Sequence, residues 1–84
     1  MEKYSPLKSY LLTQKGSHLL FSFKQIEKII CDKLPPSAYY LRQWWENSKS
    51  PGRRHVQAVA WTSAGWEVDE VYFKSQQVSF RKVT

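Results

Sequence analysis

The 84 residues of this chain carry a formal net charge of +6, and 15% of them are aromatic. That length makes one domain with a small core, and large rings help so short a chain to bury enough apolar surface. The positive charge favours an anionic partner. A single cysteine, Cys31, excludes an internal disulfide framework and indicates a reducing compartment, and we expect its side chain to be a small buried hydrophobe. The chain starts without an apolar signal segment and has no apolar run of membrane-spanning length, so we expect a soluble, cytoplasmic protein.

A helix and a short strand are predicted first. Ser5 is a preferred N-cap residue and Pro6 is tolerated in a first helical turn, so a helix begins here and ends before Gly16. Residues 19–21 form a short apolar run, which is consistent with a brief strand.

A capping box predicts the start of the second helix. Ser22 stands three residues before Gln25, the spacing at which each side chain can bond the other residue's backbone N–H. Phe23, Ile26, Ile29 and Ile30 then recur at helical spacing and form an apolar stripe. The sequence therefore predicts an amphipathic helix that packs on the core.

An aromatic helix is predicted over residues 37–47. The prolines before it, Pro35 and Pro36, end the preceding helix and redirect the chain, so the two helices read as a helix-turn-helix. One helix face cannot bury all the tyrosines and tryptophans of this segment, which leaves some rings for a partner surface. Residues 48–54 follow with the composition of a linker.

The C-terminal half is predicted to contain one ambiguous element and a hairpin. Residues 55–64 fit a helix ended by Gly65, and they also fit an alternating strand; two alanines and the glycine favour the helix. Residues 66–73 and 78–83 are rich in β-forming residues, and residues 74–77 join them as a hairpin loop.

This order of elements predicts an α+β fold, specifically a small winged-helix-like domain over residues 1–84. A helix-turn-helix core is followed by a C-terminal β-hairpin, which would serve as the wing. The short helix at residues 55–64 would separate the recognition helix from that wing.

The chain also resembles a family of small bacterial and phage domains over nearly its whole length. The resemblance rests on these segments: Pro6-Leu7, Phe23-Lys24-Gln25-Ile26-Glu27, Leu34-Pro35-Pro36-Ser37-Ala38, Trp44-Trp45-Glu46-Asn47, Ala58-Val59-Ala60-Trp61-Thr62-Ser63-Ala64-Gly65-Trp66-Glu67-Val68 and Val78-Ser79-Phe80-Arg81. Such domains look to occur alone or beside predicted nuclease domains. The resemblance therefore implies a winged-helix-like fold and a role connected with nucleic acids.

The exposed stripe of the predicted aromatic helix carries groups that can read DNA bases. Gln43 and Asn47 lie one turn apart, and either amide can pair with adenine in the major groove. Asn47 is equally suited to cap the end of the helix. Tyr39 and Arg42 share the adjoining stripe, where the arginine could pair with guanine or hold a phosphate, and where both could also simply face solvent.

Phosphate contacts are predicted in the loop that follows and on the wing. Lys49, Arg53, Arg54 and His55 give the densest positive charge in the chain. Loop cations beside a recognition helix hold phosphates and add salt-dependent affinity rather than specificity, although a solvated loop has the same composition. Arg81 would place further charge on the wing.

The four tryptophans divide into core and edge. We expect Trp45, Trp61 and Trp66 in the core. Adjacent helical residues point about 100° apart, so Trp44 cannot face the same way as Trp45 and fits either the edge of the core or a partner contact.

The residue types do not support catalysis. His18 and His55 lie far apart without metal-ligand spacing, no nucleophile elbow is present, and the three glycines are isolated. We expect no enzyme activity, no metal and no cofactor.

These patterns predict a basic module that binds duplex DNA through a helix-turn-helix and wing. The alternative is a protein-interaction module, such as a phage-type inhibitor or an accessory subunit of a nucleic-acid enzyme. In that case the exposed aromatic side chains and the acidic residues Glu67, Asp69 and Glu70 would dock onto another protein, such as a nuclease or a defence factor.

Overall fold

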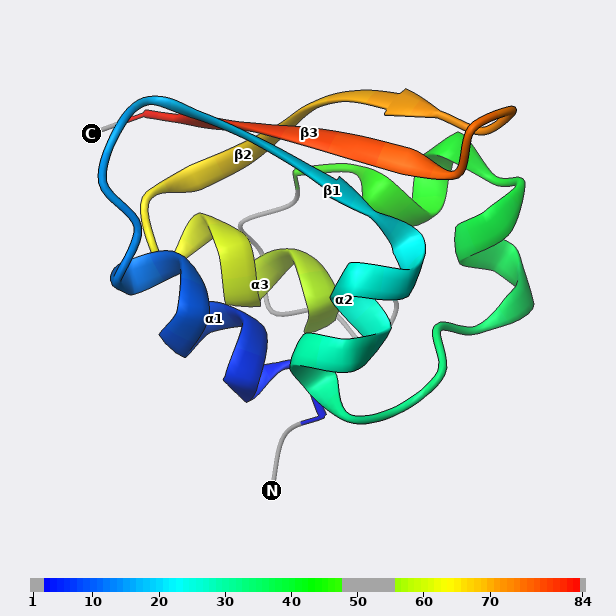
Figure 1. The fold of residues 1–84 in the computed structure, drawn as a ribbon, viewed down its shortest axis with the longest axis horizontal. Coiled ribbons are helices and arrows are strands. Elements are labelled where there is room, and N and C mark those ends of the chain that lie inside the picture. The colour runs from blue at the N-terminus through cyan, green and yellow to red at the C-terminus, as the bar shows by residue number, and fades with distance from the viewer. Residues whose placement is uncertain (1–2, 48–55, 84) are drawn as a thin grey trace.

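The computed structural model describes residues 3–47 and 56–83. These residues form a layer of helices packed on one face of a three-stranded antiparallel sheet (Figure 1). The elements in chain order are α1 (Ser5–Leu12), β1 (His18–Ser22), α2 (Phe23–Ile30), the 3-10 helices η1 (Pro36–Tyr39) and η2 (Arg42–Trp45), α3 (Val56–Thr62), β2 (Trp66–Tyr72) and β3 (Gln77–Lys82). The predicted α+β class is confirmed.

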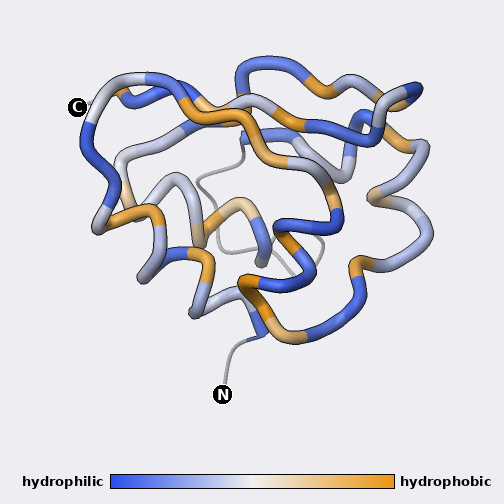
Figure 2. The backbone as a smooth tube through the Cα atoms, viewed as in Figure 1, coloured by the Kyte–Doolittle hydropathy of each residue, from blue (hydrophilic) through white to orange (hydrophobic). Residues whose placement is uncertain are grey.

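The sheet has the strand order β1-β3-β2, so the last strand lies between the other two. Phe21 and Val71 both lie opposite Val78, and this register places apolar side chains of all three strands on the face that the helices cover. The register of β2 shifts between Val68 and Glu70, where the ladder is irregular. Figure 2 shows hydrophobic residues recurring along the helices and strands, as such a two-layer packing requires.

The predicted capping box at the start of α2 is present. The Ser22 hydroxyl accepts a hydrogen bond from the Gln25 backbone N–H at 3.0 Å, and the Gln25 side chain accepts one from the Ser22 N–H at 2.8 Å. At the other end, Cys31 follows Ile30 in the left-handed conformation, with φ 56°. The cysteine thereby leaves the apolar stripe and is exposed, so the prediction that it is buried is wrong.

The start of α1 differs by one residue from the prediction. Tyr4 is the N-cap rather than Ser5, and its carbonyl accepts hydrogen bonds from the N–H groups of Leu7 and Lys8. The Tyr4 ring packs edge-on against Trp44, with 6.0 Å between ring centroids. No side-chain hydrogen bond caps this end, and Ser5 is the first residue of the helix.

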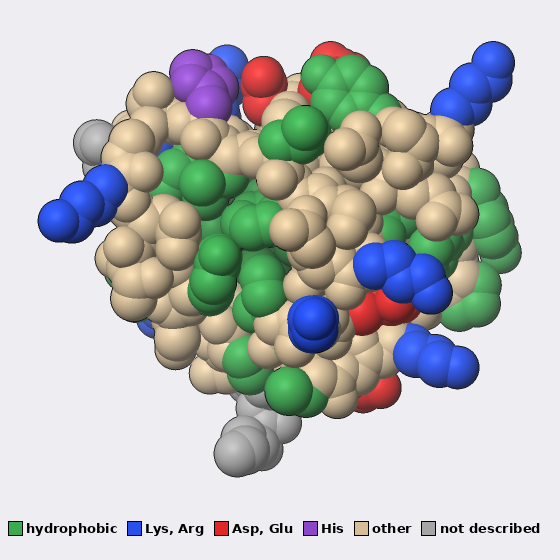
Figure 3. All heavy atoms as spheres, viewed as in Figure 1, with side chains coloured by type: hydrophobic (Ala, Val, Ile, Leu, Met, Phe, Trp, Pro, Cys, Tyr) green, Lys and Arg blue, Asp and Glu red, His purple; other side chains and the backbone are tan. Residues whose placement is uncertain are grey.

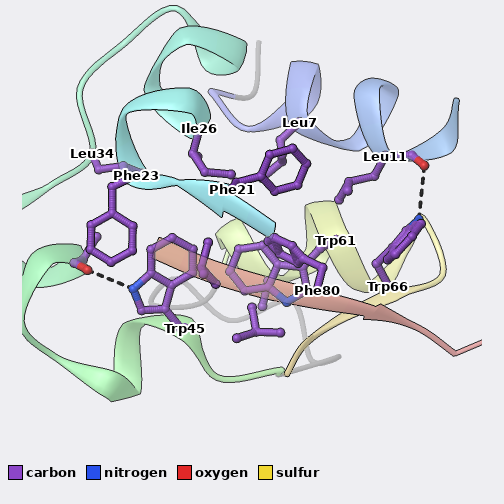
Figure 4. Close-up of a cluster of buried hydrophobic side chains, with 14 of the residues drawn as sticks. Leu7, Leu11, Phe21, Phe23, Ile26, Leu34, Trp45, Trp61, Trp66 and Phe80 are labelled. Atoms are coloured by element: carbon purple, nitrogen blue, oxygen red, sulfur yellow. Dashed lines mark hydrogen bonds between the residues drawn. The ribbon is translucent and has the colours of Figure 1, made fainter. Parts of the chain in front are cut away.

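The predicted helix over residues 37–47 is wrong. Tyr40 has φ −148° and Leu41 has φ −108° and ψ 114°, and this break separates η1 from η2. Aromatic side chains lose rotamer freedom in an α-helix, so the local preference for helix is weak. The break lets Trp45 enter the core, where its indole N–H donates to the carbonyl of Ala38 at 2.9 Å (Figure 4). The two 3-10 helices η1 and η2, and not an α-helix, directly follow α2, so the helix-turn-helix predicted for residues 23–47 is absent.

The core is built around a stack of three rings. Trp45 lies between Phe23 and Trp61, with 5.3 and 5.8 Å between ring centroids and interplanar angles of 20° and 19° (Figure 4). Trp66 fills the other end of the core and donates its indole N–H to the carbonyl of Leu11 at 3.1 Å. All three predicted core tryptophans are completely buried.

The C-terminal half confirms the helix and the hairpin. The ambiguous segment forms the helix α3, and Gly65, with φ 85°, follows its end and donates to the carbonyl of Thr62 at 3.1 Å. β2 and β3 then pair as predicted. The turn between them contains Gln76 in the left-handed conformation, with φ 54°.

Candidate nucleic-acid interface

Asn47 is held by three hydrogen bonds inside the domain. Its Oδ1 accepts from the Val68 backbone N–H at 2.7 Å and from the Trp61 indole at 2.9 Å, and its Nδ2 donates to the Val68 carbonyl at 3.0 Å. The amide therefore faces β2 and α3 rather than a partner. A base contact by Asn47 would require these bonds to break.

Tyr39 is also held by an internal partner. Its hydroxyl donates to the Glu27 carboxylate at 2.7 Å, and the same oxygen accepts from the Leu34 N–H at 2.9 Å. Burial, followed by the hydrogen bond to Glu27, raises the pKa of Tyr39 to about 12. Burial acts to raise the pKa of Glu27, but the hydrogen bonds from Tyr39 and Leu34, together with the charges of Lys24 and Lys33, outweigh burial, so the pKa lies below its ordinary value. The pair fastens η1 to α2.

Trp44 and Arg81 are engaged with their neighbours as well. Trp44 is half-buried, and its ring meets Trp45 edge-on at 4.7 Å between centroids. Arg81 donates to Glu67 at 2.8 Å and lies 3.8 Å from Asp69, and these contacts raise the pKa of the guanidinium. The ion pairs offset the charge that Arg81 was expected to bring to the hairpin.

Arg42 and Gln43 are exposed, and unlike Arg81, which is also exposed, they form no ion pair among the described residues. They follow Tyr40 and Leu41, whose exposed fractions are 65% and 47%. Residues 40–43 therefore form a continuous exposed tetrapeptide, with an aromatic ring, an aliphatic side chain, a cation and an amide. Large side chains so exposed are candidates for partner contact.

The predicted cationic loop lies outside the described residues. Lys49, Arg53, Arg54 and His55 all belong to it. The phosphate contacts expected of these residues stay a prediction.

A second group of cations, which the sequence patterns did not predict, lies on α2 and just after it. Lys24 and Lys28 are one turn apart on the polar side of α2, and Lys33 follows the helix. Among the described residues, the ion pairs are those of Lys3 and Arg81, so these three lysines form none. Their spacing in the sequence was a usable signal, because residues four apart share a helix face.

These three lysines, called here the basic face of α2, lie beside the exposed tetrapeptide. Lys24 and Lys33 both help to lower the pKa of Glu27, which places them near the contact between Glu27 and Tyr39. Tyr39 directly precedes the tetrapeptide. Figure 3 shows basic side chains gathered over α2 and the following turn, next to exposed hydrophobic side chains over the segment of η1 and η2. Cations and an exposed aromatic ring thus share one end of the molecule.

The described part of the chain offers neither a metal site nor a membrane span. Within residues 3–47 and 56–83, no group of three or more His, Cys, Asp or Glu side chains is arranged to hold a metal ion. No helix within those residues is both long and apolar enough to cross a membrane.

The helical layer and the antiparallel sheet define a small α+β domain. The chain belongs to the family described as Domain of unknown function (DUF7662), which matches residues 4–83. No curated protein and no solved structure matches the chain. The family description states no activity, so a function has to be inferred from the surface of the domain.

Proposed function

We propose that the domain binds nucleic acid through the basic face of α2. The observation that carries this proposal is that Lys24, Lys28 and Lys33 lack ion-pair partners among the described residues and lie on or beside one helix. Unpaired lysines gain affinity from phosphates by releasing condensed counterions. Such contacts position a protein on nucleic acid without reading its sequence.

The exposed tetrapeptide adds a second contact to this proposal. Tyr40 presents an exposed aromatic face, and Arg42 an exposed guanidinium, beside the basic face. Aromatic rings stack on bases and arginine holds phosphates, so both side chains suit the same partner.

We also propose that the domain has a winged-helix-like arrangement and that it binds duplex DNA with it. α3 is the third helix and directly precedes the hairpin, which is the place of a recognition helix before a wing. Ala58 and Trp61 are completely buried, however, and Gln57 is only 3% exposed, so α3 presents few groups that could enter a groove. We therefore expect duplex DNA to be bound mainly by its backbone and with weak sequence preference.

A protein-docking module is the second candidate, and the exposure of the tetrapeptide favours it. Tyrosine and arginine are enriched among residues that dominate protein interfaces. Tyr40 and Arg42 would then anchor a partner protein such as a nuclease or a defence factor, in the manner of a phage-type inhibitor or an accessory subunit.

Fluorescence anisotropy with labelled duplex and single-stranded oligonucleotides separates the two candidates. Nucleic-acid binding predicts that Lys24→Glu weakens affinity for all sequences. Lys15→Glu is the charge-matched control, because Lys15 is exposed in the connection between α1 and β1, which lies on the opposite side of the molecule from η1 and η2 (Figure 1). Equal effects of the two substitutions would indicate attraction to net charge alone. Absence of binding at low salt would leave the docking module, in which Tyr40→Ala weakens partner capture.

A further inference from the structure

A cavity of about 330 Å³ lies between the start of α1 and α3, and its lining shares no residue with the basic face of α2. Both helices line it with the same pattern of positions: Tyr4, Ser5 and Lys8 on one side, and Val59, Ala60 and Ser63 on the other. Positions i and i+4 share a helix face and position i+1 borders it, so these residues surround one interhelical space. Ser5, Ala60 and Ser63 have small side chains, which leave that space unfilled although α1 and α3 are in contact.

The cavity combines an apolar wall with one available cation. Tyr4, Val59 and Ala60 supply the wall. Lys3 also borders the cavity, but its ammonium already donates a hydrogen bond to the carbonyl of Lys33 at 3.0 Å and forms an ion pair with Asp32. Lys8 forms no ion pair among the described residues and is exposed.

We infer that this cavity binds a small organic molecule with an apolar body and a single negatively charged end. The apolar body would lie against Val59, Ala60 and the Tyr4 ring, and the anionic end would meet Lys8 at the rim. The volume of about 330 Å³ is near the lower end of small-molecule sites, which span roughly 300–1,000 Å³, so the ligand is a compact one such as a medium-chain carboxylate. This inference stands independently of nucleic-acid binding.

Octanoate is a suitable probe, with 1-octanol as its uncharged counterpart. Titration of octanoate into the isotope-labelled full chain should shift the amide resonances of α1 and α3, and leave those of residues 40–43 unchanged. Lys8→Gln should weaken octanoate binding about fivefold, the effect of an exposed ion pair, and leave octanol binding unchanged. Lys15→Gln removes the same charge elsewhere and should change neither affinity.

Filling the cavity provides the complementary test. Ala60→Leu should abolish binding of both probes while the domain keeps its native amide spectrum. If Ala60→Leu fails to fold, Ser63→Leu replaces it, because Ser63 is an exposed residue of the same lining. This variant should also abolish binding of both probes. The inference is overturned if millimolar octanoate shifts no amide of α1 or α3, if shifts spread over the whole surface, or if the folded filled variants bind as the wild type does.

Discussion

The side-chain amide of Asn47 pairs with both backbone groups of Val68, as a residue of a neighbouring strand would. Its Oδ1 and Nδ2 lie 2.7 and 3.0 Å from the Val68 nitrogen and oxygen. The same Oδ1 accepts the indole N–H of Trp61. One side chain therefore ties the end of the η2 segment both to α3 and to the free edge of β2, beside the irregular step in its pairing.

Asn47→Ala should lower the free energy of unfolding by about 2–4 kcal/mol, because it leaves several partly buried polar groups without partners. Urea denaturation measures this change. Gln43→Ala is the control, since Gln43 is exposed, and should change stability by less than about 0.5 kcal/mol. If Asn47→Ala melted like the wild type and yet bound DNA more weakly, Asn47 would be a base contact, as its residue type and position in the sequence indicate.

The hydrogen bond between Tyr39 and Glu27 should make stability depend on alkaline pH. The pKa of Tyr39 is raised from 10.0 to about 12, so its contribution is complete below pH 10 and is lost as the pH rises from 10 towards 12. Unfolding measured across that range should show the full loss in the wild type and in Tyr40→Phe. The loss should be smaller in Tyr39→Phe, where only Tyr4, whose pKa burial also raises, still contributes among the described tyrosines. An unchanged pH dependence in Tyr39→Phe would show that other groups cause it.

Trp45→Ala should destabilise the domain by about 3–5 kcal/mol, since it removes the central ring of the stack between Phe23 and Trp61. Trp44→Ala provides the comparison, because its ring is only half-buried and should cost clearly less. Thermal unfolding followed by circular dichroism distinguishes the two. Equal losses would mean that Trp44 is as much a core residue as Trp45.

Gln76→Gly should stabilise the domain by about 0.5–1 kcal/mol. Gln76 has φ 54°, and a left-handed backbone costs a residue with a side chain roughly 1–2 kcal/mol. Glycine avoids this cost, but it loses more conformational entropy on folding, which offsets part of the gain. Lys74→Gly, in the same turn but without positive φ, should bring no such gain. A gain of equal size at both positions would show that relief of the left-handed backbone at Gln76 is not its cause.

Local signals predicted those elements whose structure is set by neighbouring residues. Ser22 and Gln25 place the start of α2 because the capping box is a local bonding pattern, and Gly65 marks the end of α3 for a similar reason. The prediction of a helix over residues 37–47 was wrong because the shape of this segment depends on rings that are distant in the sequence. Trp45 stacks between two of them, those of Phe23 and Trp61. No local pattern reports that packing.

The candidate interface was only partly visible in the sequence for the same reason. Residue type alone made Tyr39 and Asn47 good contact residues, whereas their partners Glu27 and Val68 are supplied by other elements. Arg42 and Gln43 are exposed as expected. The lysines of α2 were overlooked because the densest charge of the sequence lies in the loop after residue 47.

The salt dependence of duplex DNA binding is the sharpest test of the role proposed for the basic face of α2. The logarithm of the binding constant should fall linearly with the logarithm of salt concentration in the wild type. Lys24→Gln/Lys28→Gln should flatten that slope by about 0.9 for each phosphate that the protein no longer neutralises. Lys15→Gln should leave the slope unchanged. An identical slope in the double variant, or no measurable binding by the wild type at low salt, would contradict a nucleic-acid-binding role for this face.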